Sequence, residues 1–207
     1  KNKERATYPS DYDYWGKAAF KLGKLDDAAH IYRKYLELEP SRSQEINGML
    51  AKGYFDTKNY EQASAYYLRK GAEKPLSVAD NYYLGLSYFY MDKNVQADSV
   101  FIRVLDVTPD YAPGWLMRAR VANRLDTADV EHKLFLAKEP YEKYVALAAA
   151  DPVKNKKNLI DAYKYLGWYF VQKEDNVMAK QYFDKVLELD PADKETLEFI
   201  DILKSQR

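Results

Sequence analysis

The sequence contains no cysteine, which excludes disulfide scaffolds, thiol catalysis and cysteine-based zinc sites. Histidine occurs only at His30 and His132, so a histidine-rich metal site is excluded as well. The sequence also lacks a glycine-rich phosphate-binding loop. The many carboxylates, such as Glu37 and Glu188, fall on the expected exposed ends of helices. We therefore expect neither an enzyme nor a bound metal or cofactor.

The chain has no excess of either charge, because 32 lysines and arginines balance 32 aspartates and glutamates. A general binder of nucleic acid or of anionic membranes needs a surplus of positive charge, so no nucleic-acid partner is expected. No apolar run approaches the ~20 residues that span a bilayer, so membrane insertion is not expected.

Residues that break helices are scarce, since glycine and proline number eight each. Eight of 207 residues is about 4%, which for each residue type lies below the usual ~7% glycine and ~5% proline. Tyrosine is abundant instead, with 20 copies in 207 residues. The composition favours a helical chain that is rich in aromatic side chains.

A pattern of fixed spacing recurs along the chain: a small residue, an alanine twelve positions later, and a proline twelve positions after that. An aromatic residue stands eight positions before each proline. The four full copies are Gly16, Ala28, Tyr32 and Pro40; Ala51, Ala63, Tyr67 and Pro75; Gly85, Ala97, Phe101 and Pro109; and Gly167, Ala179, Phe183 and Pro191. Each copy predicts a helical hairpin whose small residue and alanine let two helices approach closely, while the aromatic fills the space where the hairpin meets its neighbour. The proline ends the second helix.

A fifth copy is stretched, because Ala119 and Pro152 are 33 residues apart, nine more than in the others. We place the extra residues between Leu125 and Lys133. The second helix of this copy is expected to begin near Glu139. Helix starts are further indicated by Asp151-Pro152, an N-cap residue followed by proline. Three pairs resemble capping boxes: Ser10 with Asp13, Ser41 with Gln44, and Ser77 with Asp80.

The pattern resembles that of the tetratricopeptide repeat (TPR) family over about residues 9–193. The resemblance implies an all-α fold, a right-handed α-solenoid of about five helical hairpins that forms one domain over residues 1–207. The expected repeats are 9–42, 44–77, 78–111, 112–154 with the insert, and 160–193. Residues 194–207 are expected to form a capping helix in which Leu197, Ile200, Ile202 and Leu203 cover the last hairpin.

In this family the first helices of the hairpins line a concave groove that binds extended peptides or helices. The resemblance therefore implies a binding site on those helices, and aromatic and basic residues are its expected contacts. The candidate groove residues are Lys17, Lys52, Tyr82, Tyr90, Arg120, Arg124, Lys164 and Trp168. Their chemistry suits an extended acidic segment with aromatic or apolar side chains.

The expected function is that of a non-enzymatic scaffold or adaptor that binds a protein or peptide segment in the groove. A purely structural spacer within a longer array is the alternative, and nucleic-acid binding is a weaker one. Tyr12 and Tyr14 begin the first hairpin without a predicted neighbour, so we expect either that the chain is the C-terminal part of a longer array or that this end self-associates. The tyrosine-rich style resembles bacterial cell-envelope TPR proteins, which favours a periplasmic or secreted location over the cytoplasm.

Overall fold

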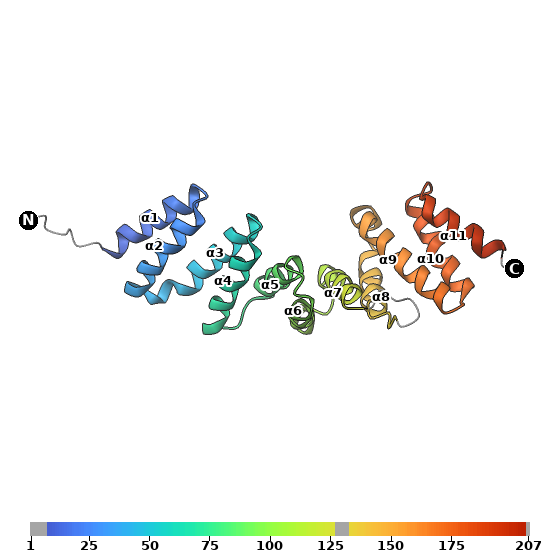
Figure 1. Ribbon diagram of the computed structural model, residues 1–207, viewed down its shortest axis with the longest axis horizontal. Helices are drawn as coiled ribbons and strands as arrows, with labels where there is room; N and C mark the ends of the chain where they lie inside the picture. Colours follow the sequence, from blue (N-terminus) through green and yellow to red (C-terminus); the bar gives the residue numbers. More distant parts are fainter. Residues whose placement is uncertain (1–7, 127–132, 206–207) are drawn as a thin grey trace, which may run out of the picture. The chain divides into compact units, whose positions relative to one another are not determined.

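The computed structural model describes residues 8–126 and 133–205, and within them the chain forms eleven α-helices, one short 3-10 helix and no strand (Figure 1). The predicted all-α helical-repeat fold is confirmed. The chain divides into two compact bodies, an N-terminal body that ends at Lys93 and a C-terminal body that begins at Asn94. The organisation of residues 1–207 as one domain stays a prediction.

Within each body, helices that follow one another in the chain pack against each other, and most are joined by short connections. The N-terminal body contains α1 (Pro9–Lys21), α2 (Leu25–Leu38), the 3-10 helix η1 (Pro40–Arg42), α3 (Ser43–Asp56), α4 (Tyr60–Glu73) and α5 (Val78–Tyr90). The C-terminal body contains α6 (Asn94–Val107), α7 (Ala112–Leu125), α8 (Lys138–Ala148), α9 (Pro152–Gln172), α10 (Asn176–Leu189) and α11 (Lys194–Ser205). These bounds agree with the predicted repeats as far as residue 148.

The last repeat differs from the prediction, because its first helix begins at Pro152 and the predicted repeat begins at 160. The Asp151 side chain accepts a hydrogen bond from the backbone N–H of Lys154 at 3.1 Å, and Pro152 supplies the first helical residue. No residue between 154 and 160 breaks a helix, so the helix runs on without a second start. The predicted start of the preceding helix near Glu139 agrees with α8, which begins at Lys138. The insert placed between 125 and 133 lies largely outside the described residues.

Only one of the three expected capping boxes forms, that of Ser77 with Asp80 at the start of α5. Helix α1 begins at Pro9, one residue before Ser10, and the Asp11 carboxylate accepts the Tyr8 backbone N–H at 3.0 Å. Ser41 lies inside η1, because Pro40 starts a 3-10 turn that leads directly into α3. At Ser10 and at Ser41, the proline that precedes the expected N-cap residue starts the helical turn one residue early.

The aromatic residue of each full repeat packs within its own hairpin where the structure resolves the contact. A Cβ atom added to Gly16 would lie 2.7 Å from the Tyr32 ring, and one added to Gly167 would lie 2.6 Å from the Phe183 ring. Both rings are almost fully buried. The sequence assigned these rings to the space where a hairpin meets its neighbour. The structure places each over the small residue of its own first helix, and the Phe183 ring also contacts Phe199 of the next helix, as that assignment expects.

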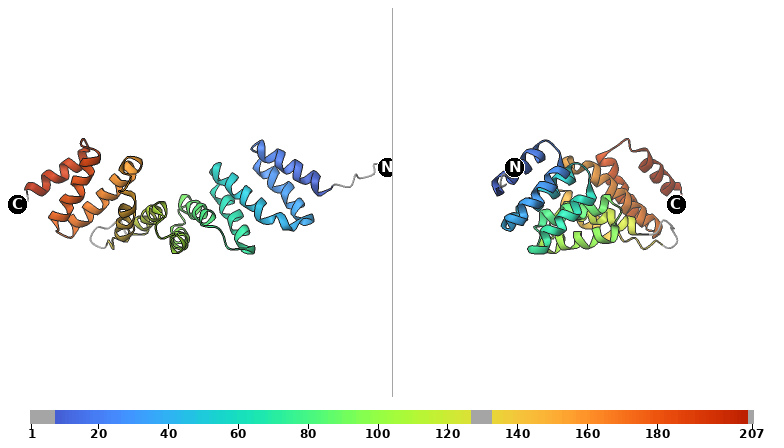
Figure 2. Two further views of the ribbon diagram at one scale, coloured as in Figure 1. Left: turned by 180° about the vertical axis from the view of Figure 1, so that it is seen from behind. Right: turned by 60° about the vertical axis from the view of Figure 1, so that its left-hand side comes forward.

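The last helix, α11, caps the final hairpin as expected. Ile200 and Leu203 are buried against α10, and the Phe199 ring stacks on Phe183 with the ring centres 5.4 Å apart. Figure 2 shows α9, α10 and α11 side by side from two further directions. Leu197 and Ile202 differ from the prediction, because they lie on the exposed side of the helix.

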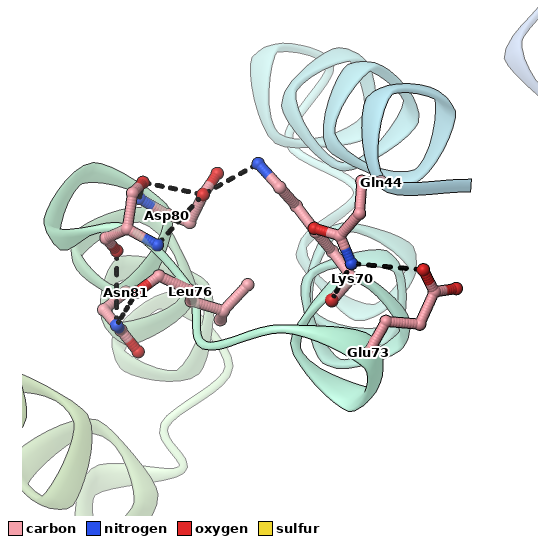
Figure 3. Close-up of polar contacts among 7 residues, drawn as sticks. Gln44, Lys70, Glu73, Leu76, Asp80 and Asn81 are labelled. Atoms are coloured by element: carbon pink, nitrogen blue, oxygen red, sulfur yellow. Dashed lines mark hydrogen bonds and ion pairs between the residues drawn. The ribbon is translucent and has the colours of Figure 1, made fainter. Parts of the chain in front are cut away.

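A network of polar contacts joins the second hairpin to α5 (Figure 3). The Lys70 ammonium donates to the Asp80 carboxylate at 2.8 Å, and the Gln44 amide donates to the Lys70 carbonyl oxygen at 2.7 Å. The Ser77 hydroxyl also donates to Asp80, at 2.6 Å. Burial raises the pKa of Asp80, but the hydrogen bonds from Lys70 and Ser77 outweigh it and hold the pKa below its usual value.

In four of the short turns between helices, one residue has a positive φ angle. Gly23, Lys58, Asp92 and Glu174 have φ angles of 73°, 62°, 55° and 58°. Only glycine adopts this left-handed region without a steric penalty, and other L-residues pay roughly 1–2 kcal/mol there. Three of the four turns therefore store backbone strain that the first turn avoids.

Replacing Lys58 with glycine is expected to raise the free energy of unfolding by up to about 1 kcal/mol, because glycine removes the strain at some cost in chain entropy. Urea unfolding followed by circular dichroism measures the change. Lys93→Gly, at an exposed turn lysine without a positive φ, serves as the control and is expected to be neutral or destabilising. A loss of stability in Lys58→Gly would contradict the strain argument.

Replacing Asp80 with asparagine is expected to lower the free energy of unfolding by about 1–2 kcal/mol at pH 7, because it removes a half-buried ion pair. Since the folded pKa is depressed, the carboxylate stabilises the fold fully above the ordinary pKa of 3.8 and loses this effect as the pH falls below it. The difference in free energy of unfolding between wild type and variant should therefore become smaller as the pH falls below 3.8. Asp106→Asn, on the exposed side of α6, is the control. A difference that stays constant with pH would refute this role for Asp80.

Candidate binding surface

The first helices of the N-terminal body lie side by side, as the repeat pattern predicts. Phe20 of α1 packs against Gly53 of α3, where an added Cβ would approach its ring to 2.7 Å. The Phe55 ring of α3 lies 4.9 Å from the Tyr83 ring of α5. The candidate residues Lys17, Lys52, Tyr82 and Tyr90 all belong to these helices, and we call their surface the N-terminal first-helix face.

The lysines of the N-terminal first-helix face are paired within their own helices. Lys17 forms an ion pair with Asp13, and Lys52 forms one with Asp56. The Lys52 ammonium also lies 5.2 Å from the centre of the Tyr83 ring. Each positive charge is thus balanced by a carboxylate one turn away, which reduces the field available to attract an acidic partner.

The two candidate tyrosines of this face take part in a cluster of rings. Tyr90 is 52% exposed and stacks on Tyr60, with ring centres 4.7 Å apart. Tyr82 is half-buried, and its ring centre lies 6.1 Å from that of Tyr83. Tyr90 consequently offers the larger accessible ring surface.

In the C-terminal body, two of the candidate cations hold neighbouring helices together. Arg120 of α7 donates to the Asn158 side-chain oxygen of α9 at 2.9 Å. Lys164 of α9 contacts Asp193 at 2.7 Å and Glu195 at 2.8 Å, at the start of the capping helix. Arg120 and Lys164 therefore stabilise the stack, and Arg124 on α7 is the more exposed candidate.

The contact with Lys164 also affects the ionisation of Asp193. Burial raises the pKa of Asp193, but hydrogen bonds from Lys164 and Thr196 outweigh it and hold the pKa below its usual value. Burial lowers the pKa of Lys164, whereas its bonds to Asp193 and Glu195 raise it above the usual value. Both groups therefore remain charged near neutral pH, and the link between α9 and α11 persists there.

Trp168 lies in a cluster of aromatic and lysine side chains at the end of α9. Its ring centre is 5.3 Å from that of Phe135, and the Lys133 ammonium lies 5.4 Å from the indole. The Lys173 ammonium lies 5.3 Å from the Phe135 ring and 5.9 Å from the Tyr169 ring. We call these five residues the aromatic–lysine cluster. It combines flat ring surfaces with positive charge, which suits carboxylates next to apolar groups.

Sequence reasoning identified Trp168 but missed its neighbours. Phe135 and Lys133 follow the insert, where the repeat pattern gives no register, and Lys173 follows the last residue of α9. Phe135 has a φ of 56°, a backbone conformation that the sequence does not signal. The spacing of the first helices could have located Tyr83, because it follows Tyr82 and faces α3.

The first helix exposes aromatic side chains at the N-terminal end of the chain. Tyr14 is 72% exposed and Trp15 is 48% exposed, while Tyr12 packs edge-on against Trp15. Such a face is suited to contact with another apolar surface. Self-association through this end stays a prediction.

Within the described residues the chain has neither a metal-ion site of clustered side chains nor a helix that could span a membrane. No group of three or more His, Asp or Glu side chains in residues 8–126 and 133–205 is arranged to hold a metal ion. None of the helices described there is long and apolar enough to cross a membrane.

Comparison with known proteins supports the repeat pattern. The family model described as tetratricopeptide repeat matches residues 16–42 and 161–193. No curated protein matches the chain. Among solved structures, the C-terminal part of a TPR repeat-containing protein from Cytophaga hutchinsonii is 29% identical, with a TM-score of 0.75. The match covers 96% of this chain and 75% of that chain.

Two further structures share the fold at lower identity. The protein MamA is 23% identical, with a TM-score of 0.64 over 88% of this chain and 92% of that one. YrrB, described as a TPR protein with an unusual peptide-binding site, is 17% identical, with a TM-score of 0.64 over 97% of this chain and 94% of that one. The repeat family and the fold of these neighbours indicate, in general terms, a protein-interaction module. The repeat spacing, the helical hairpins and these matches together show that the chain contains tetratricopeptide repeats at residues 16–42 and 161–193 and shares its fold with solved TPR proteins.

Proposed function

We propose that the protein is a non-enzymatic interaction module that binds an acidic peptide segment containing an aromatic side chain. The segment binds to the first helices of the C-terminal body. The aromatic–lysine cluster carries the proposal, because it places two lysine ammonium groups within 6 Å of three aromatic rings.

The ring contacts of Lys173 leave its ammonium available to a carboxylate. An ammonium group over an aromatic face is attracted by about 0.5–1 kcal/mol at exposed sites and keeps N–H donors directed elsewhere. A carboxylate that reaches Lys173 would therefore add a charge-assisted hydrogen bond while an adjacent side chain packs on Trp168 or Tyr169. Tryptophan and tyrosine, which the cluster contains, are also among the residue types that most often dominate binding energy at interfaces.

The N-terminal first-helix face contributes less to the attraction of an acidic segment. Lys17 and Lys52 each have an aspartate partner on the same helix, so a peptide carboxylate would have to displace it. An exposed ion pair of this kind contributes about 0.2–1 kcal/mol. A peptide carboxylate that replaced the aspartate would therefore gain little binding energy, because it would only exchange one such pair for another. Tyr90 remains as the exposed aromatic contact of this face.

The proposal is tested by screening the folded chain against an array of peptides that vary in acidic and aromatic content, followed by fluorescence anisotropy on the best binder. The double variant Lys133→Glu with Lys173→Glu is expected to weaken binding by about tenfold or more, because it turns two attractions into repulsions. Wild-type binding should also weaken as salt concentration rises.

The matched control is the double variant Lys24→Glu with Lys93→Glu, which makes the same charge change at exposed hairpin turns of the N-terminal body. It should bind the peptide like the wild type. If both double variants bound the peptide with equal affinity, the aromatic–lysine cluster would not be the binding site. A chain that selects no peptide would favour the structural spacer, and one that binds single-stranded RNA in preference to acidic peptides would favour the nucleic-acid alternative.

A further inference from the structure

A second candidate site lies in the N-terminal body, between the second helices α2 and α4. A pocket of about 500 Å³ opens there, and residues at the start of α3 form its floor. We call it the α2–α4 pocket. Its volume lies within the ~300–1,000 Å³ that is usual for small-ligand sites, and it can take one large side chain together with its backbone.

The pocket lies on the opposite side of α3 from the N-terminal first-helix face. Ser43, Asn47 and Leu50 of α3 line the pocket. Helical spacing of 3.6 residues per turn places them about half a turn away from Lys52 and Asp56. A ligand in the α2–α4 pocket would therefore leave the first-helix face free, so this site goes beyond the proposed function.

The interior of the pocket is apolar. Leu36 of α2, Leu50 of α3 and Tyr66 of α4 contribute to the walls, and Leu50 and Tyr66 are 2% and 6% exposed. These side chains are held by the surrounding core, since Tyr66 also stacks on Tyr54 with ring centres 5.5 Å apart. The walls are consequently pre-formed and offer a surface to an aliphatic or aromatic group.

Positive charge stands on both sides of the opening. Arg33 projects from α2 and Arg69 from α4, and both side chains are exposed and line the pocket. The Arg69 guanidinium lies 4.5 Å from the centre of the Tyr66 ring, which fixes its plane and leaves its N–H edge for a ligand. Neither arginine takes part in an ion pair within the described residues.

The one carboxylate that lines the pocket is already bonded. Glu73 accepts a hydrogen bond from the Ser43 hydroxyl. It also accepts a longer one, at 3.4 Å, from the Gln44 amide (Figure 3). It therefore faces α3 and forms no ion pair with Arg33 or Arg69. The two arginines outnumber this one carboxylate, so the lining keeps a net positive charge around an apolar interior.

We infer that the α2–α4 pocket binds a partner protein through a segment in which one large apolar side chain is flanked by acidic residues. The apolar side chain fills the space between Leu36 and Tyr66, and the flanking carboxylates pair with Arg33 on one wall and Arg69 on the other. Two arginines on facing helices select a segment with carboxylates on both sides. Arginine supplies the paired N–H donors that match carboxylate geometry.

The probe for this site is the blocked peptide Gly-Glu-Phe-Glu-Gly, titrated into the ¹⁵N-labelled full chain and followed by NMR. Saturable shifts are expected at amides of α2 and α4 around the pocket and at the Arg33 and Arg69 Nε–H signals. The peptide Gly-Gln-Phe-Gln-Gly, which lacks the charges, should bind about tenfold or more weakly. The peptide Gly-Glu-Ala-Glu-Gly, which lacks the ring, should also bind more weakly.

Three variants locate the interaction. Arg33→Gln with Arg69→Gln is expected to reduce affinity for the probe by at least about tenfold, and Ala72→Trp, at an exposed position of the pocket lining, should block the pocket. Arg103→Gln, an exposed arginine of α6, is the matched control and should leave binding unchanged. Thermal unfolding of each variant verifies the fold.

The inference is overturned if the probe gives no saturable shifts, if its shifts map to the first-helix face, or if the double arginine variant binds it as tightly as the wild type. The two peptide controls keep the test valid if a variant fails to fold, because they use the wild-type chain. The result is independent of the aromatic–lysine cluster, since Lys133→Glu with Lys173→Glu should leave this binding intact.

Discussion

The fold depends on the close fit between a large ring on the second helix of a hairpin and a small residue on the first. At Gly16 and Gly167 the facing rings leave no room for a further carbon atom. At the same position the second and fourth repeats carry Ala51 and Ala119, both fully buried. The contact fixes how closely and at which level the two helices of a hairpin pack, because protein interiors tolerate little excess volume.

This packing determines where the proposed binding residues can lie. Once the ring and the small residue face each other, the next residue of the first helix, Lys52 or Trp168, lies about 100° round the helix from that contact. The second helices leave a space between neighbouring hairpins, and in the N-terminal body that space is the α2–α4 pocket. One chain therefore offers two chemically related surfaces, each with aromatic rings and positive charge. In both, a basic group lies beside an aromatic ring, as Lys133 does at Trp168 and Arg69 at Tyr66.

The sequence predicts what depends on local spacing and on single residues. The repeat gave the hairpins through α7, and the Ser77–Asp80 capping box and the Asp151-Pro152 start were visible as short motifs. The repeat pattern does not predict the contacts between one repeat and the next. The pairing of Lys164 with Asp193 and Glu195 joins positions about thirty residues apart, and no periodic pattern encodes it. The neighbours of Trp168 follow an insert that interrupts the period.

The most direct test of the packing constraint is the free energy of unfolding of Gly167→Ala, measured in the wild-type chain and in a Phe183→Leu background. Against the native ring, the added methyl group should destabilise the chain by about 1–3 kcal/mol. Against leucine the conflict is relieved, and alanine should be neutral or stabilising by up to about 1 kcal/mol, because it is the better helix former. A change of the same sign and size in both backgrounds would contradict the account.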